Sequence, residues 1–188
     1  VMSLRPTDKE FNQILGLGIP VALLGGIDDR CSCVSIDDIK AAETATQHLI
    51  DMGHRKIGLM VGQRELAFNF EVAIQRKKGF LNALKRNKIE FNPAYELIAD
   101  FDNHTAELAM DEFLGRKDLP TAIFCESDEM AYGVIKSVRK KGLRVPEDIS
   151  VVGFDDHEFS ATMGLTTVAQ PPRFLGQLAA SQILAAIE

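Results

Sequence analysis

The sequence has no tryptophan and only three cysteines, Cys31, Cys33 and Cys125, in 188 residues. An odd cysteine count with one C-x-C pair argues against a disulfide framework, and no further ligand stands at zinc-site spacing. No hydrophobic run approaches the roughly 20 residues of a membrane-spanning helix, and no signal peptide is recognisable. We therefore expect no membrane segment, no metal and structural roles for the cysteines.

The sequence also lacks an excess of positive charge. Its 21 basic and 27 acidic residues give a net charge of -6. Such a chain is not built to bind nucleic-acid phosphates by itself, so contact with nucleic acid would require a partner or another segment. Dinucleotide, P-loop, nucleophile-elbow and zinc-protease motifs are absent too. Because nothing activates a nucleophile, binding is favoured over catalysis, and we expect no enzyme activity and no cofactor.

The most informative stretch runs from Pro120 to Asp156. Residues 121–125 are apolar and rich in β-formers, and residues 130–138 carry apolar side chains at helical spacing. Gly142 suits the end of that helix, and residues 149–154 form an apolar run typical of a strand buried on both faces. The pattern predicts a strand–helix–strand unit with parallel strands.

The rest of the chain continues this alternation. We expect helices near 6–17, 38–52, 72–87, 105–114 and 173–187, and strands near 1–4, 19–24, 33–36, 57–61, 95–99 and 166–168. The apolar faces of the helices are predicted to include Ile74, Leu108, Phe174, Leu178 and Leu184. The order of elements predicts an α/β protein with parallel sheets.

Polar residues follow the predicted strands. They are Asp37-Asp38, Gln63-Arg64, Asp100-Asp102, Ser127-Asp128 and Asp155-Asp156. Each alone is best explained as a helix cap or a turn, but together they would form a polar cleft suited to a neutral polyhydroxylated ligand. Phe101 could stack on a ring or belong to the core. His54 follows a helix, a position that favours a partly cationic ring, but a structural role is the favoured interpretation.

Several ordered motifs resemble the LacI/GalR family of bacterial transcription regulators. They are IPVALL, VSIDD, ATQHLIDMGHRKIGLMVG, QRKKGFLNAL, GLRVPEDISVVGFDD and LTTVAQP. The resemblance implies two Rossmann-like lobes of the type I periplasmic-binding-protein kind, with effector between them. An incomplete N-terminal lobe would comprise residues 1–37 and 169–188, and the C-terminal lobe residues 38–168.

The resemblance also implies the effector site. Arg76 matches a family arginine that contacts effector hydroxyls, Asp155 its partner acid, Phe101 a packing aromatic and Gln170 a polar residue near the pocket floor. Ser127 would belong to the same site, but it stands where the family usually has asparagine, so the ligand pattern there differs. Phe68 and Phe70 would either line the pocket mouth or pack beneath a long loop.

The implied function is allosteric control of transcription. A small polar effector, a sugar or related molecule, would control operator DNA binding by a helix-turn-helix domain absent from this sequence. A cytoplasmic homodimer would form through surfaces that include the helix around Tyr132 and the loop from Phe159 to Met163. An extracytoplasmic sugar-binding protein of a transporter is the alternative.

Overall fold

The computed structural model describes residues 6–62 and 71–187, and the chain divides into two compact units. Among the described residues, the first unit comprises 6–37, 71–72 and 171–187, and the second comprises 38–62 and 73–170. The strand expected at 1–4, the polar pair Gln63-Arg64 and the aromatic residues Phe68 and Phe70 lie outside the described residues. No helix in the described part of the chain has the length and apolarity needed to cross a membrane.

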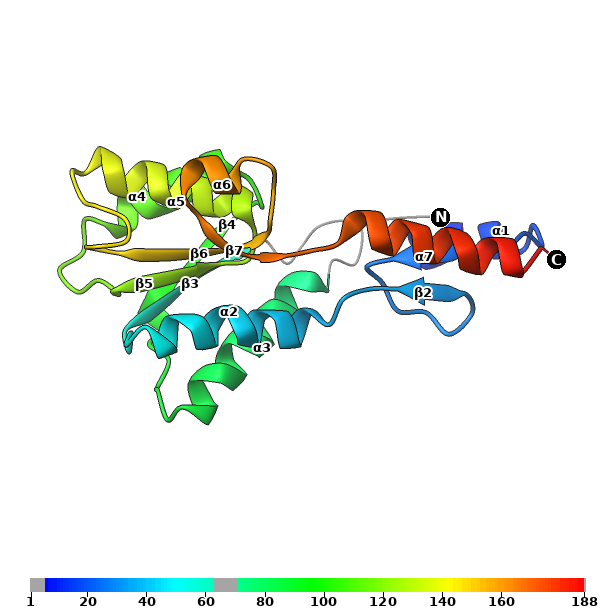
Figure 1. Cartoon of the computed structure of the whole chain (residues 1–188), viewed down its shortest axis with the longest axis horizontal. Helices are drawn as coiled ribbons and strands as arrows, with labels where there is room; N and C mark the ends of the chain where they lie inside the picture. Colours follow the sequence, from blue (N-terminus) through cyan, green and yellow to red (C-terminus); the bar gives the residue numbers. More distant parts are fainter. Residues whose placement is uncertain (1–5, 63–70, 188) are drawn as a thin grey trace. The chain divides into compact units, whose positions relative to one another are not determined.

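The second unit is built on a parallel five-stranded sheet. Its strands are β3 (Ile57–Gly62), β4 (Glu96–Ala99), β5 (Ala122–Cys125), β6 (Ser150–Asp155) and β7 (Thr166–Ala169), in the order β4-β3-β5-β6-β7. In this unit α4 (Asn103–Phe113) and α5 (Asp128–Lys140) cover one face of the sheet, and α2 (Asp38–Asp51) and α3 (Val72–Arg86) cover the other (Figure 1). The prediction of an α/β fold with a parallel sheet is confirmed.

The hydrophobic core of this unit lies on both faces of β3, β5 and β6. All six residues of β3 and all four of β5 are buried, as expected for central strands between two helical layers. A short 3-10 helix η1 (Pro93–Tyr95) precedes β4, and a short helix α6 (Ser160–Met163) precedes β7. Residues 160–163, expected as part of a loop, are therefore helical, and Met163 packs against the core of the second unit. All the strand pairs are parallel, so their carboxyl ends meet at one edge of the sheet.

The first unit contains α1 (Asp8–Leu15), a parallel pair β1 (Ala22–Leu24) and β2 (Ser32–Val34), and α7 (Pro172–Ala185). Thr7 and Glu10 form a capping box at the start of α1. The buried cluster joins α7 to the two strands through Ala22, Val34 and Ala179.

Several apolar side chains do not face inward as predicted. Ile74 on α3 and Leu108 on α4 are each 55% exposed, and Phe174, Leu178 and Leu184 on α7 are exposed too. Helical spacing identifies an apolar stripe, but the width of the sheet decides how much of it is covered. On α7 the apolar side chains that pack with the two-stranded sheet are Leu175, Ala179 and Ile183.

Candidate functional site

Polar residues that follow the strands in the sequence lie together at the carboxyl-end edge of the five-stranded sheet. β6 ends at Asp155, Gln170 follows β7, and Glu126 and Ser127 follow β5. Arg76 reaches this edge from the first turns of α3. The structure therefore brings Arg76, Asp155 and Gln170 together, all within the second unit.

Arg76 is the only cation with a described contact to this edge, and it is almost fully buried, with 5% of its surface exposed. Its Nε donates to Asp38 Oδ1 at 2.8 Å, and its Nη1 donates to the backbone oxygen of Glu126. The guanidinium carbon lies 3.6 Å from the centre of the Phe154 ring. These three contacts fix the orientation of the planar guanidinium group, which suits precise recognition of polar ligands.

Asp155 lies beside the guanidinium and faces outward more than Arg76 does. Its Oδ1 is 3.7 Å from Arg76 Nη1, and its side chain keeps 35% of its surface exposed. Gln170 holds it twice, donating from Nε2 to Oδ1 at 2.5 Å and from its backbone N–H to the Asp155 carbonyl at 3.2 Å. Burial raises the pKa of Asp155, while Arg76 and Gln170 act in the opposite direction.

The backbone of Asp155 is strained, because its φ of 126° is unusual for any residue other than glycine. Such strain is commonly found where a side chain is held for function. Described hydrogen bonds use Nε and Nη1 of Arg76 but not Nη2. A ligand hydroxyl could therefore accept a hydrogen bond from Arg76 while a neighbouring hydroxyl donates to Asp155.

Phe101 also lies at the edge, and its described contacts are with the core of the second unit and with Gly62. Its φ is 58°, and the half-buried side chain packs against the core of the second unit. The ring covers Gly62, where an added Cβ would lie 1.9 Å from a ring atom. These contacts favour the packing role of Phe101, and its contact with a ligand stays a prediction.

Ser127 is committed to the structure rather than turned toward a ligand. It is 5% exposed, and its hydroxyl accepts a hydrogen bond from the Met130 N–H at 3.2 Å, which caps α5. The next residue, Asp128, is fully buried and accepts hydrogen bonds from the backbone of His157 and from the hydroxyls of Ser160 and Thr167. Asp128 thus holds the corners after β5 and β6, as its position beside a helix start predicted.

Sequence reasoning did not assign Asp38 and Glu126 to the environment of Arg76. The position of Asp38 predicts a polar residue at a strand end, yet Asp38 is 5% exposed and pairs with Arg76. Glu126 is fully buried, and its Oε2 accepts a hydrogen bond from the Gly62 N–H at 3.0 Å. A charged residue next to a buried strand is a signal in the sequence for a buried polar contact. The sequence does not show that the partner is Arg76 on α3, because that contact depends on the tertiary fold.

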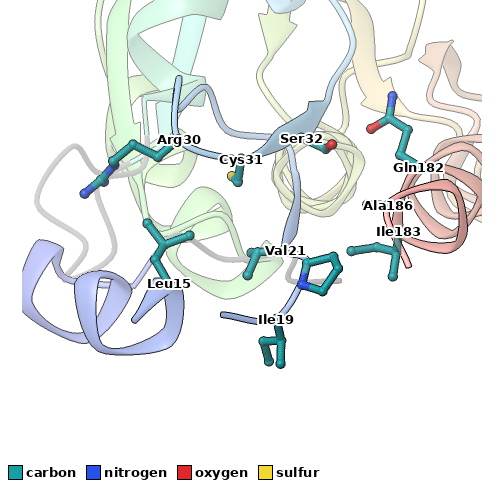
Figure 2. Close-up of a pocket in the computed structure, with 10 residues that line it drawn as sticks. Leu15, Ile19, Val21, Arg30, Cys31, Ser32, Gln182, Ile183 and Ala186 are labelled. Atoms are coloured by element: carbon teal, nitrogen blue, oxygen red, sulfur yellow. The ribbon is translucent and has the colours of Figure 1, made fainter. Parts of the chain in front are cut away.

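A separate pocket of about 410 Å³ lies in the first unit (Figure 2). Leu15, Val21, Cys31 and Ile183 contribute to its lining. Arg30 at its edge is engaged by Asp28, Asn12 and the Phe11 ring, and burial with the nearby Cys33 raises the pKa of Cys31 to about 11. The thiol is thus protonated at neutral pH, and no group of potential metal ligands occurs among the described residues.

Comparison with known proteins identifies relatives of this chain. Residues 46–188 match the periplasmic binding protein-like domain family. The probable HTH-type transcriptional repressor ExuR of Bacillus subtilis is 35% identical over 100% of this chain and 56% of its own length. The ribose operon repressor of Haemophilus influenzae is 38% identical over 77% of this chain and 43% of its own length. The chain thus spans about half the length of these curated relatives.

Two solved structures that resemble this chain are also transcription regulators. A transcription regulator from Lactobacillus plantarum superposes with a TM-score of 0.90 and 28% identity, covering 99% of this chain and 70% of that one. A LacI family regulator from Enterococcus faecium with bound ribose has a TM-score of 0.86 and 26% identity, with coverage of 99% and 70%.

These relatives are transcription regulators rather than transporter components or enzymes. Together with the parallel α/β fold and the polar strand-end edge, they place the sequence in one family. The chain belongs to the periplasmic binding protein-like domains of LacI/GalR transcription regulators, as an effector-binding domain of that family.

Proposed function

We propose that this chain binds a small polar effector, a sugar or a related polyhydroxylated molecule, and thereby controls DNA binding by a helix-turn-helix segment of the same regulator. The pairing of Arg76 with Asp155 is the observation that supports it best. This pair offers a donor and an acceptor 3.7 Å apart at the carboxyl-end edge of a parallel sheet. Sugars, with neighbouring hydroxyls that both donate and accept, match such a pair.

The ligand chemistry draws further support from two solved relatives. One was solved with ribose, and another, 29% identical with a TM-score of 0.83, is a CelR–cellobiose complex. In the proposal, ligand binding favours one arrangement of the regulator over another, and operator affinity changes only by the ratio of ligand affinities for the two arrangements. Such a regulator acts in the cytoplasm, where its operator lies.

We further propose that the regulator is a homodimer and that α5 and the loop before α6 contribute to the interface. The ring of His157 stacks on Phe159 at 5.7 Å, and Tyr132 meets His157 edge-on at 6.4 Å. Phe159 is 55% exposed. An exposed aromatic group held in place by such contacts suits a protein interface.

The effector proposal is tested by a thermal-shift screen of the complete gene product with ribose, cellobiose, nucleosides and sugar phosphates, followed by calorimetry. A ligand that binds only the native state raises the melting temperature. We expect Arg76→Ala and Asp155→Ala each to weaken binding of the ligand found by about 100-fold or more, since each removes one half of a partly buried polar pair. The variants should remain folded.

Arg86→Ala and Asp156→Ala are matched controls, because they remove an exposed arginine on the same helix and the exposed acid next to Asp155. Both should bind the ligand with unchanged affinity. Wild-type affinity in the Arg76→Ala, Asp155→Ala double variant would show that the site lies elsewhere.

A further inference from the structure

The pocket in the first unit belongs to a different unit from the Arg76 edge, and the proposed function does not use it. It is bounded by the end of α1, by the chain just before β1, by the start of β2 and by the end of α7 (Figure 2). Its volume of about 410 Å³ lies within the range of roughly 300–1,000 Å³ that is usual for small-molecule sites.

Apolar side chains come to this pocket from three parts of the first unit. Leu15 is the last residue of α1, Val21 directly precedes β1, and Ile183 lies on α7. Ile183 also packs against the buried cluster of the unit, so the wall that it forms is held in place. Such walls favour a ligand with an apolar body, because contact with them removes apolar surface from water.

The side-chain amide of Gln182 in the pocket wall is not committed to the protein. Its Oε1 is buried, and no described residue donates a hydrogen bond to it. Buried polar atoms nearly always have a hydrogen-bond partner, because removing them from water without one costs free energy. The last torsion of a glutamine side chain has broad minima, so a small turn presents the amide oxygen or nitrogen to the pocket.

The hydroxyl of Ser32 is a second uncommitted polar group. Ser32 begins β2, and its backbone N–H donates to the Val21 carbonyl at 3.3 Å, whereas the described hydrogen bonds do not involve its hydroxyl. Figure 2 shows this hydroxyl and the Gln182 amide on the same side of the pocket. An amide and a hydroxyl can each donate and accept, so together they match a ligand group that does both.

The charged residue at the pocket edge does not require an anion. Arg30 makes two parallel hydrogen bonds to Asp28, from Nε to Oδ1 at 2.8 Å and from Nη2 to Oδ2 at 2.6 Å. Its Nη1 donates to Asn12 Oδ1 at 2.6 Å, and its guanidinium carbon lies 4.9 Å from the centre of the Phe11 ring. The charge is therefore compensated within the protein, which favours an uncharged ligand.

We propose that this pocket is a second ligand site, for a small uncharged molecule whose apolar body carries a carboxamide or cyclic amide group. The amide N–H of the ligand donates to Gln182 Oε1, and its carbonyl oxygen accepts from Gln182 Nε2 or from the Ser32 hydroxyl. This chemistry differs from that of the polyhydroxylated effector proposed for Arg76 and Asp155, and the pocket does not depend on which effector binds there.

The site is tested by nuclear magnetic resonance titration of the complete gene product with three probes that share one aromatic body. Benzamide carries a donor and an acceptor, acetophenone only the acceptor, and benzoate a negative charge. We expect benzamide to bind about tenfold more tightly than either of the others, because it alone satisfies the Gln182 amide without adding charge. No binding of benzamide up to about 20 mM, or equal or tighter binding of acetophenone or benzoate, would overturn the proposal.

Gln182→Leu removes both amide atoms and keeps a side chain of similar size. It should lower the affinity for benzamide to that for acetophenone without lowering the melting temperature, because the buried oxygen has no partner to lose. Gln177→Leu, an exposed change on the same helix, is the control and should bind benzamide as the wild type does. A retained preference for benzamide in Gln182→Leu would contradict the proposed contact.

Arg76→Ala distinguishes this site from the effector site. Benzamide binding should be unchanged in this variant, because Arg76 belongs to the other unit. Loss of benzamide binding would show that the probe occupies the effector site, and would overturn the second site. Failure of every sugar to bind would count against the proposed function alone.

Cys31 reports where the probe binds. Its half-buried thiol lines the pocket, and because its pKa is raised to about 11, alkylation by iodoacetamide is carried out near pH 9 to ionise part of it. Saturating benzamide should slow alkylation of Cys31 by about threefold or more, as measured by peptide mass spectrometry. Cys125, fully buried in β5, should stay unlabelled while the protein is folded.

Ala186→Trp places an indole ring at an exposed position on the pocket edge. It should abolish both benzamide binding and the protection of Cys31, because the larger side chain obstructs the pocket. Benzamide binding without protection of Cys31 in the wild type would place the probe elsewhere and overturn the proposal.

Discussion

At the scale of single residues, burial changes the chemistry that sequence position suggests. His54 follows a helix end, where a cationic ring would be favoured. In the structure its Nδ1 lies 2.9 Å from the Thr121 hydroxyl and its Nε2 3.0 Å from the Ser150 hydroxyl, and burial lowers its pKa. Burial thus opposes the cationic form that the helix end favours, and the two hydroxyl contacts agree with the structural role that the sequence favoured for His54.

A pH effect on stability follows from this lowered pKa. As the pH falls through the ordinary histidine value near 6.5, the unfolded chain takes up a proton at His54 before the folded chain does. Stability should therefore decrease toward lower pH, and the loss attributable to His54 should be complete below its lowered folded pKa. We expect His54→Gln to show a smaller decrease in urea midpoint between pH 7.5 and 5 than the wild type.

Tyrosine fluorescence can follow this unfolding, since both tyrosines, Tyr95 and Tyr132, lie in the second unit with His54. Thr44→Ala on α2, an exposed change at a residue that does not titrate, is the control and should keep the wild-type pH dependence. An unchanged dependence in His54→Gln would assign the effect to other groups.

At the scale of elements, close contact between helices depends on glycine. An added Cβ on Gly133 of α5 would lie 2.2 Å from the backbone oxygen of Asn103 and 2.8 Å from the backbone nitrogen of Glu107. Both atoms belong to α4, so neither can move as a flexible side chain would. The α4–α5 pair is further joined by Lys136 and Glu107 at 2.5 Å.

Gly133→Ala should therefore destabilise the second unit by about 1–3 kcal/mol, despite the better helix propensity of alanine. Urea unfolding measures the change. Arg139→Ala, an exposed substitution on the same helix, should stay within about 0.5 kcal/mol of the wild type. A stabilised Gly133→Ala variant would mean that the two helices lie farther apart than described.

At the scale of the whole molecule, the proposed dimer makes a prediction about Phe159. Phe159→Asp places a charge on an exposed aromatic surface without disturbing the core. If that surface is an interface, burying the charge there is costly, and the dimer dissociation constant should rise by at least 100-fold. Sedimentation equilibrium of the complete gene product measures this constant.

Ile98→Asp is the matched control for that experiment. Ile98 on β4 is exposed to a similar degree, 61% against 55% for Phe159, and lies on a different element. A monomeric wild type, or equal effects of both substitutions, would contradict the assignment of this surface.

The sequence by itself determined most of the elements that form, the short helices η1 and α6 excepted. Apolar runs at residues 57–61 and 149–154 predicted the central strands, and the motifs carrying Arg76 and Asp155 indicated the family. These signals are local, because a strand or helix is recorded in the periodicity of a few neighbouring residues.

Only the tertiary structure decided which side chains meet. It joined Asp38, Arg76 and Glu126 across 88 positions, buried the helix cap Ser127 and left Ile74 exposed. Whether a polar group is paired, buried or exposed depends on residues distant in sequence, and that pairing sets the free energy of its charge. The element pattern is therefore readable from the chain, whereas the network around Arg76 exists only in the folded protein.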